Sequence, residues 1–133
     1  MEIRKEDVIM FNLAYKDNYG TPSGVLIPMA EGVTYVPGVA LDEKGEVASG
    51  ETKPAYICAG NGAGVLDGEI LAHRIYDDMV FETVLTADGS ALKVGDKVTL
   101  SEDGKGVTAT TGGSAEIVEI INSANGGAVR VRF

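Results

Sequence analysis

Apolar and charged residues alternate at the end of the chain. Within residues 128–133, three apolar side chains alternate with two arginines; in order they are Val129, Arg130, Val131, Arg132 and Phe133. Because successive side chains of a strand point to opposite faces, this pattern predicts a half-buried strand with one apolar and one charged face. Lys97–Leu100 and residues 115–121 also have strand character. The last third of the chain therefore indicates a sheet.

Turn compositions separate these runs. Residues 101–106, 111–114 and 122–127 are rich in Gly, Asn, Asp and Ser. Gly and Asn accept positive φ, and Asp and Ser hydrogen-bond to their own backbone, so such segments reverse the chain. We therefore expect a meander of antiparallel strands that ends inside a sheet.

Short apolar runs continue through the middle of the chain. They cover residues 25–27, 33–36, 39–41, 55–58, 69–75 and 79–85. Pro28 and Pro37 have no N–H group for a strand ladder, so they belong at strand ends, edges or bulges. The pattern predicts a mainly β fold: a compact antiparallel β-barrel or sandwich of short strands with Gly-rich turns. Spacing alone leaves barrel and sandwich open.

The first 23 residues are the least strand-like. They mix apolar positions with a charged cluster at residues 4–7, and residues 17–24 interrupt any regular structure. A short helix, an extended arm and a loosely packed terminus all fit this pattern. We expect an N-terminal arm or short helix over residues 1–23 and a single β-rich domain over residues 24–133.

Composition adds to this picture. The chain has 133 residues with 18 glycines, four prolines and no tryptophan, which favours strands and turns over helices. Its net charge of −9 argues against duplex nucleic acid and anionic membranes as partners. No apolar run approaches the roughly 18 to 20 residues of a membrane span. The charged start also differs from a signal peptide, so we expect a cytoplasmic protein unless cell lysis releases it.

Residues that could support catalysis are few. Cys58 is the single cysteine, which excludes a disulfide framework, and its apolar neighbours predict a small buried residue rather than a reactive thiol. His73 is the single histidine, with no second His or Cys for a metal, and we place it on a surface or sheet face. We expect no cofactor, no metal and no enzymatic activity.

A glycine-rich segment at residues 59–64 suggests a phosphate-binding loop at first sight. The dinucleotide fingerprint requires a third Gly where Val65 stands, and the following residues predict a strand rather than a helix. No Gly-Lys-Ser/Thr follows for a P-loop. A hairpin loop that could touch a neighbouring subunit is the better interpretation.

The last third of the chain resembles a known class of proteins. Four stretches carry the resemblance: Leu-Lys-Val-Gly-Asp-Lys-Val-Thr-Leu at 92–100, Asp-Gly-Lys-Gly-Val-Thr-Ala-Thr at 103–110, Ala-Glu-Ile-Val-Glu-Ile at 115–120 and Val-Arg-Val-Arg-Phe at 129–133. This order is similar to the head decoration, or capsid cement, proteins of tailed phages and prophages of Gram-positive bacteria. Residues 53–57 and 76–85 fit more weakly, so the resemblance covers about residues 50–133.

The resemblance implies a structural virion protein on the outer surface of the phage head, present in the host cytoplasm during assembly. Its expected partners are the major capsid protein and further copies of itself, as trimers or other small clusters. Family members commonly use an N-terminal arm for lattice contacts. The candidate capsid or subunit contacts are Ile3, Val8, Ile9, Phe11, Leu13, Tyr15, Tyr19, Gly60, Asn61 and Gly62.

A second function class remains open. A small β-barrel module that binds a ligand or carbohydrate would need aromatic platforms, and the chain has five Tyr, three Phe and no Trp. Tyr15, Tyr19 and Tyr35 are the residues that could supply one. We expect these three tyrosines to pack in the fold or to line a protein interface instead.

Overall fold

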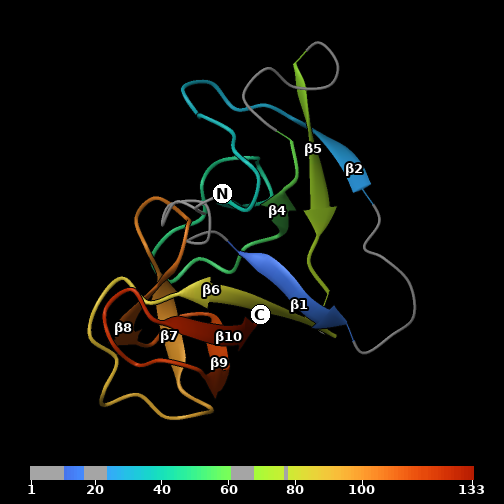
Figure 1. Ribbon diagram of the computed structural model, residues 1–133. Helices are drawn as coiled ribbons and strands as arrows, with labels where there is room; N and C mark the ends of the chain where they lie inside the picture. Colours follow the sequence, from blue (N-terminus) through green and yellow to red (C-terminus); the bar gives the residue numbers. More distant parts are fainter. Residues whose placement is uncertain (1–10, 17–23, 61–67, 77) are drawn as a thin grey trace, which may run out of the picture.

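A computed structural model describes residues 11–16, 24–60, 68–76 and 78–133. Within these ranges the chain forms ten β-strands and no helix. The strands make two antiparallel sheets, of six and four strands (Figure 1). The predicted mainly β fold of short antiparallel strands is confirmed. The larger sheet is not closed into a barrel, so the arrangement is sandwich-like.

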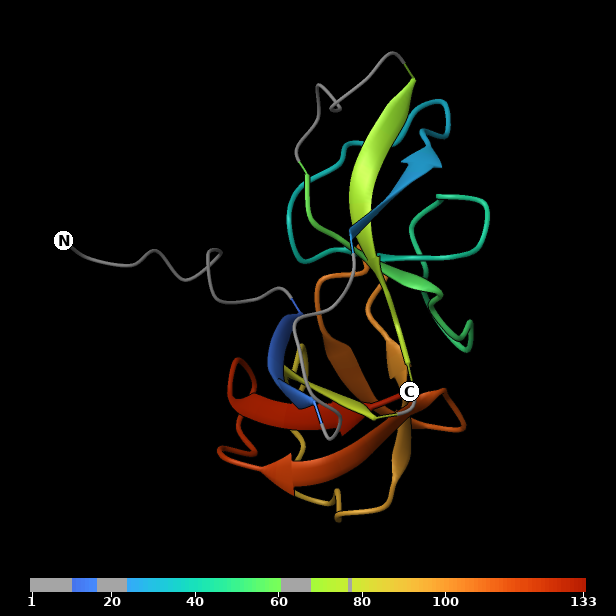
Figure 2. The same cartoon turned by 90° about the vertical axis from the view of Figure 1, so that its right-hand side faces the viewer.

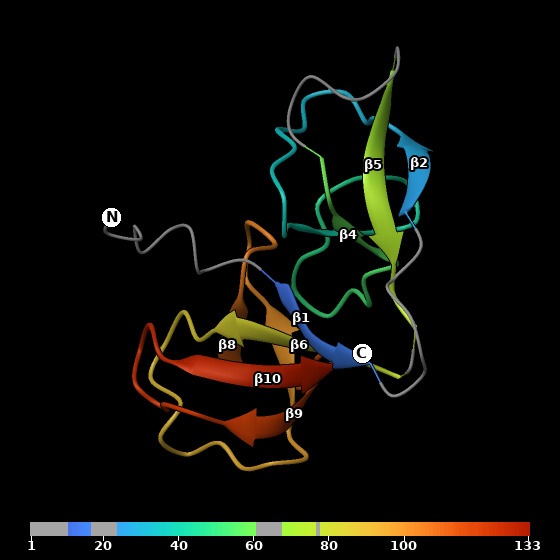
Figure 3. The same cartoon turned by 45° about the vertical axis from the view of Figure 1, so that its right-hand side comes forward.

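The larger sheet has β1 and β8 at its two edges. Its strand order is β1 (Asn12–Lys16), β6 (Met79–Val84), β10 (Ala128–Arg132), β9 (Ala115–Ile120), β7 (Lys97–Leu100) and β8 (Val107–Thr111). β1, β6, β10 and β9 lie side by side in Figure 3. One isolated parallel bridge, Leu85 to Val107, brings the start of β8 towards the end of β6.

The smaller sheet has the order β2 (Gly24–Pro28), β5 (Glu69–Arg74), β4 (Tyr56–Cys58) and β3 (Ala40–Leu41). Figures 1 and 2 both show it above the larger sheet. Residues 33–36, which the pattern predicts as a strand, form a loop instead. Pro37 follows this loop and has no N–H to donate, and the next donor, Gly38 N, bonds to Cys58 O at 2.7 Å.

The predicted antiparallel meander is confirmed for its three strands, because β7 pairs with β9 and β9 pairs with β10. One further strand, β8, pairs with the other side of β7. The pattern did not predict β8 as a strand, because its threonines give no clear apolar face. The other runs of the last third agree with β7, β9 and β10 to within one residue. Val129 and Val131 are fully buried, as the alternation predicted for β10.

Two hydrophobic cores are joined through β3 and β4. Ala40 and Ile57, which pair across these strands, belong to the core of the larger sheet. Their neighbours Leu41 and Tyr56, also a cross-strand pair, belong to the core of the smaller sheet. Since successive side chains of a strand point to opposite faces, this short ribbon forms a wall shared by both cores.

Backbone contacts also connect the two sheets. Gly50 and Leu100 exchange two hydrogen bonds, of 3.1 and 2.9 Å. The turn between β7 and β8 reaches the smaller sheet, where Ala40 N donates to Gly104 O at 2.9 Å. Gly104 has φ +68°, and a Cβ there would lie 2.8 Å from a methyl of Val47. Only glycine satisfies both conditions without strain.

Part of the predicted N-terminal arm lies within the larger sheet. β1 pairs with β6 in antiparallel register, with an irregularity between Leu13 and Tyr15. Phe11, directly before β1, is 2 % exposed and belongs to the larger core. Burial of this ring explains why residues 11–16 are not separable from the domain. Residues 1–10 and 17–23 of the predicted arm lie outside the described residues.

Candidate functional site

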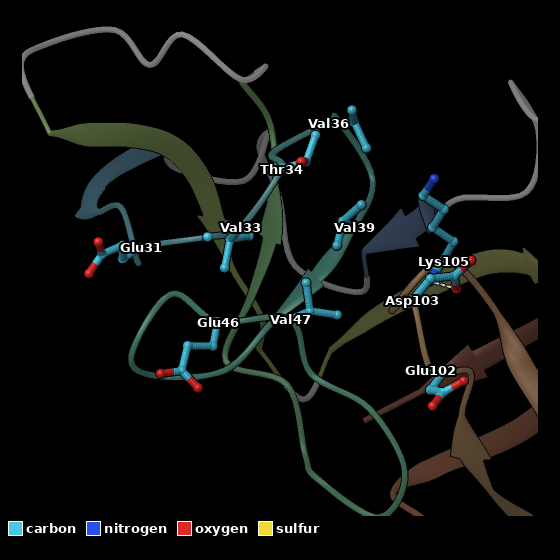
Figure 4. A pocket seen from close by; sticks show the side chains of 11 residues that line it. Glu31, Val33, Thr34, Val36, Val39, Glu46, Val47, Glu102, Asp103 and Lys105 are labelled. Carbon is cyan, nitrogen blue, oxygen red and sulfur yellow. Dashed lines mark hydrogen bonds between the residues drawn. The ribbon is translucent and has the colours of Figure 1, made fainter.

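A pocket of about 540 Å³ lies where the loops of the smaller sheet meet the β7–β8 turn. Its size falls within the roughly 300 to 1,000 Å³ that is usual for ligand sites. Eleven residues from three separate segments line it: Glu31, Gly32, Val33, Thr34, Val36, Val39, Glu46, Val47, Glu102, Asp103 and Lys105. In Figure 4 the carboxylates lie to either side of the central valines.

Tyr35 holds the first of these segments in place. Its side chain is fully buried, its hydroxyl donates to Gly45 O at 2.6 Å, and it accepts from Ala30 N at 2.6 Å. The hydroxyl therefore ties the loop before Val36 to the turn before Val47. With Tyr35 facing inwards, its neighbours on either side remain at the pocket wall.

The β7–β8 turn is held by side-chain hydrogen bonds. Asp103 accepts from Ser101 Oγ at 2.8 Å and from Lys105 N at 3.1 Å. Ser101 Oγ in turn accepts from Gly106 N at 3.0 Å. These bonds reverse the chain tightly, as Asp and Ser commonly do in turns, and orient Glu102 and Lys105 at the pocket.

The pocket combines an apolar base with an acidic rim. Val39 is buried, and Val33, Val36 and Val47 are half-buried against the core of the smaller sheet. Glu31, Glu46, Glu102 and Asp103 are exposed, and Lys105 supplies the one positive charge of the lining. Four carboxylates and one ammonium leave a formal charge of −3 at neutral pH. This arrangement suits a ligand with both apolar surface and positive charge.

Metal binding has little support in the described part of the chain. No group of three or more His, Cys, Asp or Glu side chains there is close enough to hold a metal ion. The four carboxylates of the pocket lining therefore form a charged rim rather than a set of metal ligands.

The contact residues that the sequence suggested fall into different environments in the structure. Phe11 is buried and packs in the core, so it is not a surface contact. Gly60 follows β4, and its N–H bonds to Leu71 O at 3.0 Å. Leu13 and Tyr15 lie on β1, whose backbone alone is described. The remaining candidates lie outside the described residues: Ile3, Val8, Ile9, Tyr19, Asn61 and Gly62.

Two predictions about single residues are confirmed. Cys58 is 2 % exposed, with its thiol donating to Gly60 O at 3.1 Å, and burial raises the pKa of the thiol above its ordinary value. His73 lies half-buried on β5, on a sheet face. Tyr35 is different: its burial rules it out as an exposed aromatic platform.

The β4–β5 hairpin agrees with the interpretation of the glycine-rich segment. β4 pairs with β5 in antiparallel register, so residues 59–68 connect two neighbouring strands. A Cβ at Gly60 would lie 2.9 Å from Ile70, which explains glycine at that position. Residues 61–67 lie outside the described part of the chain.

Sequence reasoning did not find the pocket. Its residues come from loops at 31–39, 46–47 and 102–105, which carry no shared motif and no regular spacing. The nearest sequence signal was Asp103-Gly104, which predicted a turn but not its contact with the smaller sheet.

Comparison with protein-family models, curated proteins and solved structures finds no match. Among the described residues, no helix has the length and apolar character needed to cross a membrane.

Proposed function

We propose that this chain is a capsid decoration protein, which binds the outer surface of an assembled phage head and stabilises the coat lattice. The proposal rests on the resemblance, expected from the sequence alone, between four ordered stretches in residues 92–133 and head decoration proteins. Those stretches supply β7, β8, β9 and β10, which are neighbours in one sheet. The similarity therefore covers a contiguous structural unit rather than scattered segments.

The architecture suits a passive structural role. The two sheets share the β3–β4 wall and are joined by the Gly50–Leu100 and Ala40–Gly104 backbone contacts. These contacts hold the two sheets together, which supports a load-bearing role. The role needs no catalysis and no cofactor.

The mechanism would be thermodynamic. A protein that binds assembled coat more tightly than free subunits shifts the equilibrium towards the assembled state, by about 2.7 kcal/mol per site at a concentration 100 times Kd. Each copy would bind across a junction between subunits of the major capsid protein. Copies would cluster as trimers or similar groups at local symmetry axes, on the virion exterior, after synthesis in the host cytoplasm.

Residues 1–10 are the proposed coat-binding arm. Residues 11–16 are excluded from it, because Phe11 is buried and β1 is paired with β6. A deletion that tests the arm should therefore end at residue 10. We expect this variant to keep the wild-type melting temperature and to lose head binding.

A ligand-binding module is the second candidate, and the pocket is the observation that favours it. None of the eleven lining residues is aromatic, so the pocket offers no stacking platform for a sugar ring. A cationic ligand fits its charge better than a carbohydrate.

Co-sedimentation tests the proposal. Purified protein is mixed with undecorated heads of the phage that encodes the chain, and with free coat subunits as the control. Saturable binding to heads and weak binding to subunits is the expected result. Absence of binding to heads would overturn the proposal and favour the ligand-binding module.

A further inference from the structure

We propose that the pocket between residues 31–39, 46–47 and 102–105 receives a basic side chain, arginine or lysine, presented by a protein partner. This inference rests on the proposed function for the identity of the partner, the coat protein. It adds a specific docking point on the described part of the chain, separate from residues 1–10.

The base of the pocket fits the aliphatic part of such a side chain. Val33, Val36, Val39 and Val47 together form an apolar surface. Arginine and lysine bury their methylene stems on apolar surfaces while their charged ends stay in a polar environment. A purely apolar side chain would leave the acidic rim without a counterpart.

The rim fits the charged end. Glu31, Glu46 and Glu102 are exposed, and none of them is paired with any of the basic side chains that the structure describes. By contrast, Glu82 and Glu119 on the larger sheet are already bridged by Arg130, at 3.3 and 3.4 Å. Among the described side chains, the rim carboxylates thus have no basic partner that an incoming cation would have to displace. Charge-assisted hydrogen bonds of this kind are stronger than neutral ones.

The position of the pocket favours a macromolecular partner. It opens at the junction of two sheets, and its two walls are held together by the Ala40–Gly104 hydrogen bond. The walls are thus preorganised, which lowers the entropy lost on binding. A basic residue on the coat would also be attracted by the net charge of −9 of the whole chain.

Matched charge reversals test the inference on heads. Glu46→Lys places a positive charge on the rim, whereas Glu51→Lys makes the same change at an exposed residue outside the lining. We expect Glu46→Lys to weaken head binding about tenfold and Glu51→Lys to change it by less than about twofold. Both side chains are exposed, so both variants should melt like the wild type. Equal binding by the two variants would overturn the inference and leave the decoration role standing.

A peptide probe separates the inference from the decoration role. Isotope-labelled protein is titrated with a synthetic peptide of alternating valine and arginine, and with one of alternating valine and glutamate. We expect amide shifts at Val33, Val47 and Lys105 with the basic peptide only. Such shifts would support the pocket even if the heads bind no protein. Absence of these shifts, or the same shifts with the acidic peptide, would overturn the inference.

Discussion

The ring of Phe11 packs against the ring of Phe133, with centroids 5.6 Å apart and planes inclined at 56°. Phe133 also contacts Phe81, at 5.9 Å between centroids. The residue before β1 and the residue after β10 therefore meet over β6, the strand that lies between β1 and β10. This cluster closes one side of the larger core.

Removing the Phe11 ring should strongly destabilise the fold. Phe11 is 2 % exposed, and Phe→Ala in a core typically costs about 3 to 5 kcal/mol. We expect Phe11→Ala to lower the free energy of unfolding by about that amount in urea titration. Phe11→Leu should lose markedly less. A loss for Phe11→Ala below about 1 kcal/mol would contradict the packing of this ring in the core.

Alanine substitutions at Gly104 and Gly112 test the contact between the two sheets, with Gly112 as the control. Both have positive φ, +68° and +96°, but a Cβ at Gly112 would meet nothing within 4 Å. Gly112→Ala should therefore cost only the backbone strain, about 1 to 2 kcal/mol. Gly104→Ala should cost about 1 to 3 kcal/mol more, because it also overpacks against Val47 and the Ala40 carbonyl. Equal losses, measured by thermal unfolding, would show that the turn does not dock as described.

The Tyr35 hydroxyl should stabilise the fold in addition to the burial of the Tyr35 ring. Tyr35→Phe keeps the ring but leaves Ala30 N and Gly45 O without their shared partner. A buried group without a partner costs about 1 to 3 kcal/mol, and we expect that loss in urea unfolding. Tyr76→Phe is the control, because Tyr76 is 48 % exposed, and it should be near neutral.

Cys58 should react slowly in the folded protein. Burial raises its pKa, so the unreactive thiol form persists into the alkaline range. Ellman's reagent at pH 8 should label the native protein at least about a hundredfold more slowly than the urea-unfolded chain. Similar rates in the two states would contradict the burial of Cys58.

The raised pKa of Cys58 also affects stability at high pH. The folded state holds the thiol proton more tightly than the unfolded state does. The resulting contribution to the free energy of unfolding is therefore fully present below the unfolded thiol pKa of about 8.5. It is lost as the pH rises from there through the folded pKa. Replacement by alanine should remove that part of the alkaline loss of stability. If the free energy of unfolding of Cys58→Ala fell with rising pH as steeply as that of the wild type, the raised pKa of Cys58 would be contradicted.

Local sequence determined most of the strands. The apolar alternation of residues 129 and 131 and the turn compositions around β7, β9 and β10 were sufficient, because strand periodicity and turn chemistry depend on neighbouring residues only. The same logic placed Cys58 in a buried strand. It failed for residues 33–36, where Tyr35 is held by hydrogen bonds to Ala30 and Gly45 rather than by a strand ladder.

Tertiary structure alone decided the rest. The pairing of β1 with β6 and the meeting of three loops at the pocket both join residues that are far apart in sequence. Such contacts depend on which buried surfaces fit one another, and periodicity within a strand carries no information about its partner. The chain by itself therefore determined a β protein with an acidic surface, and long-range packing determined where its carboxylates and valines come together.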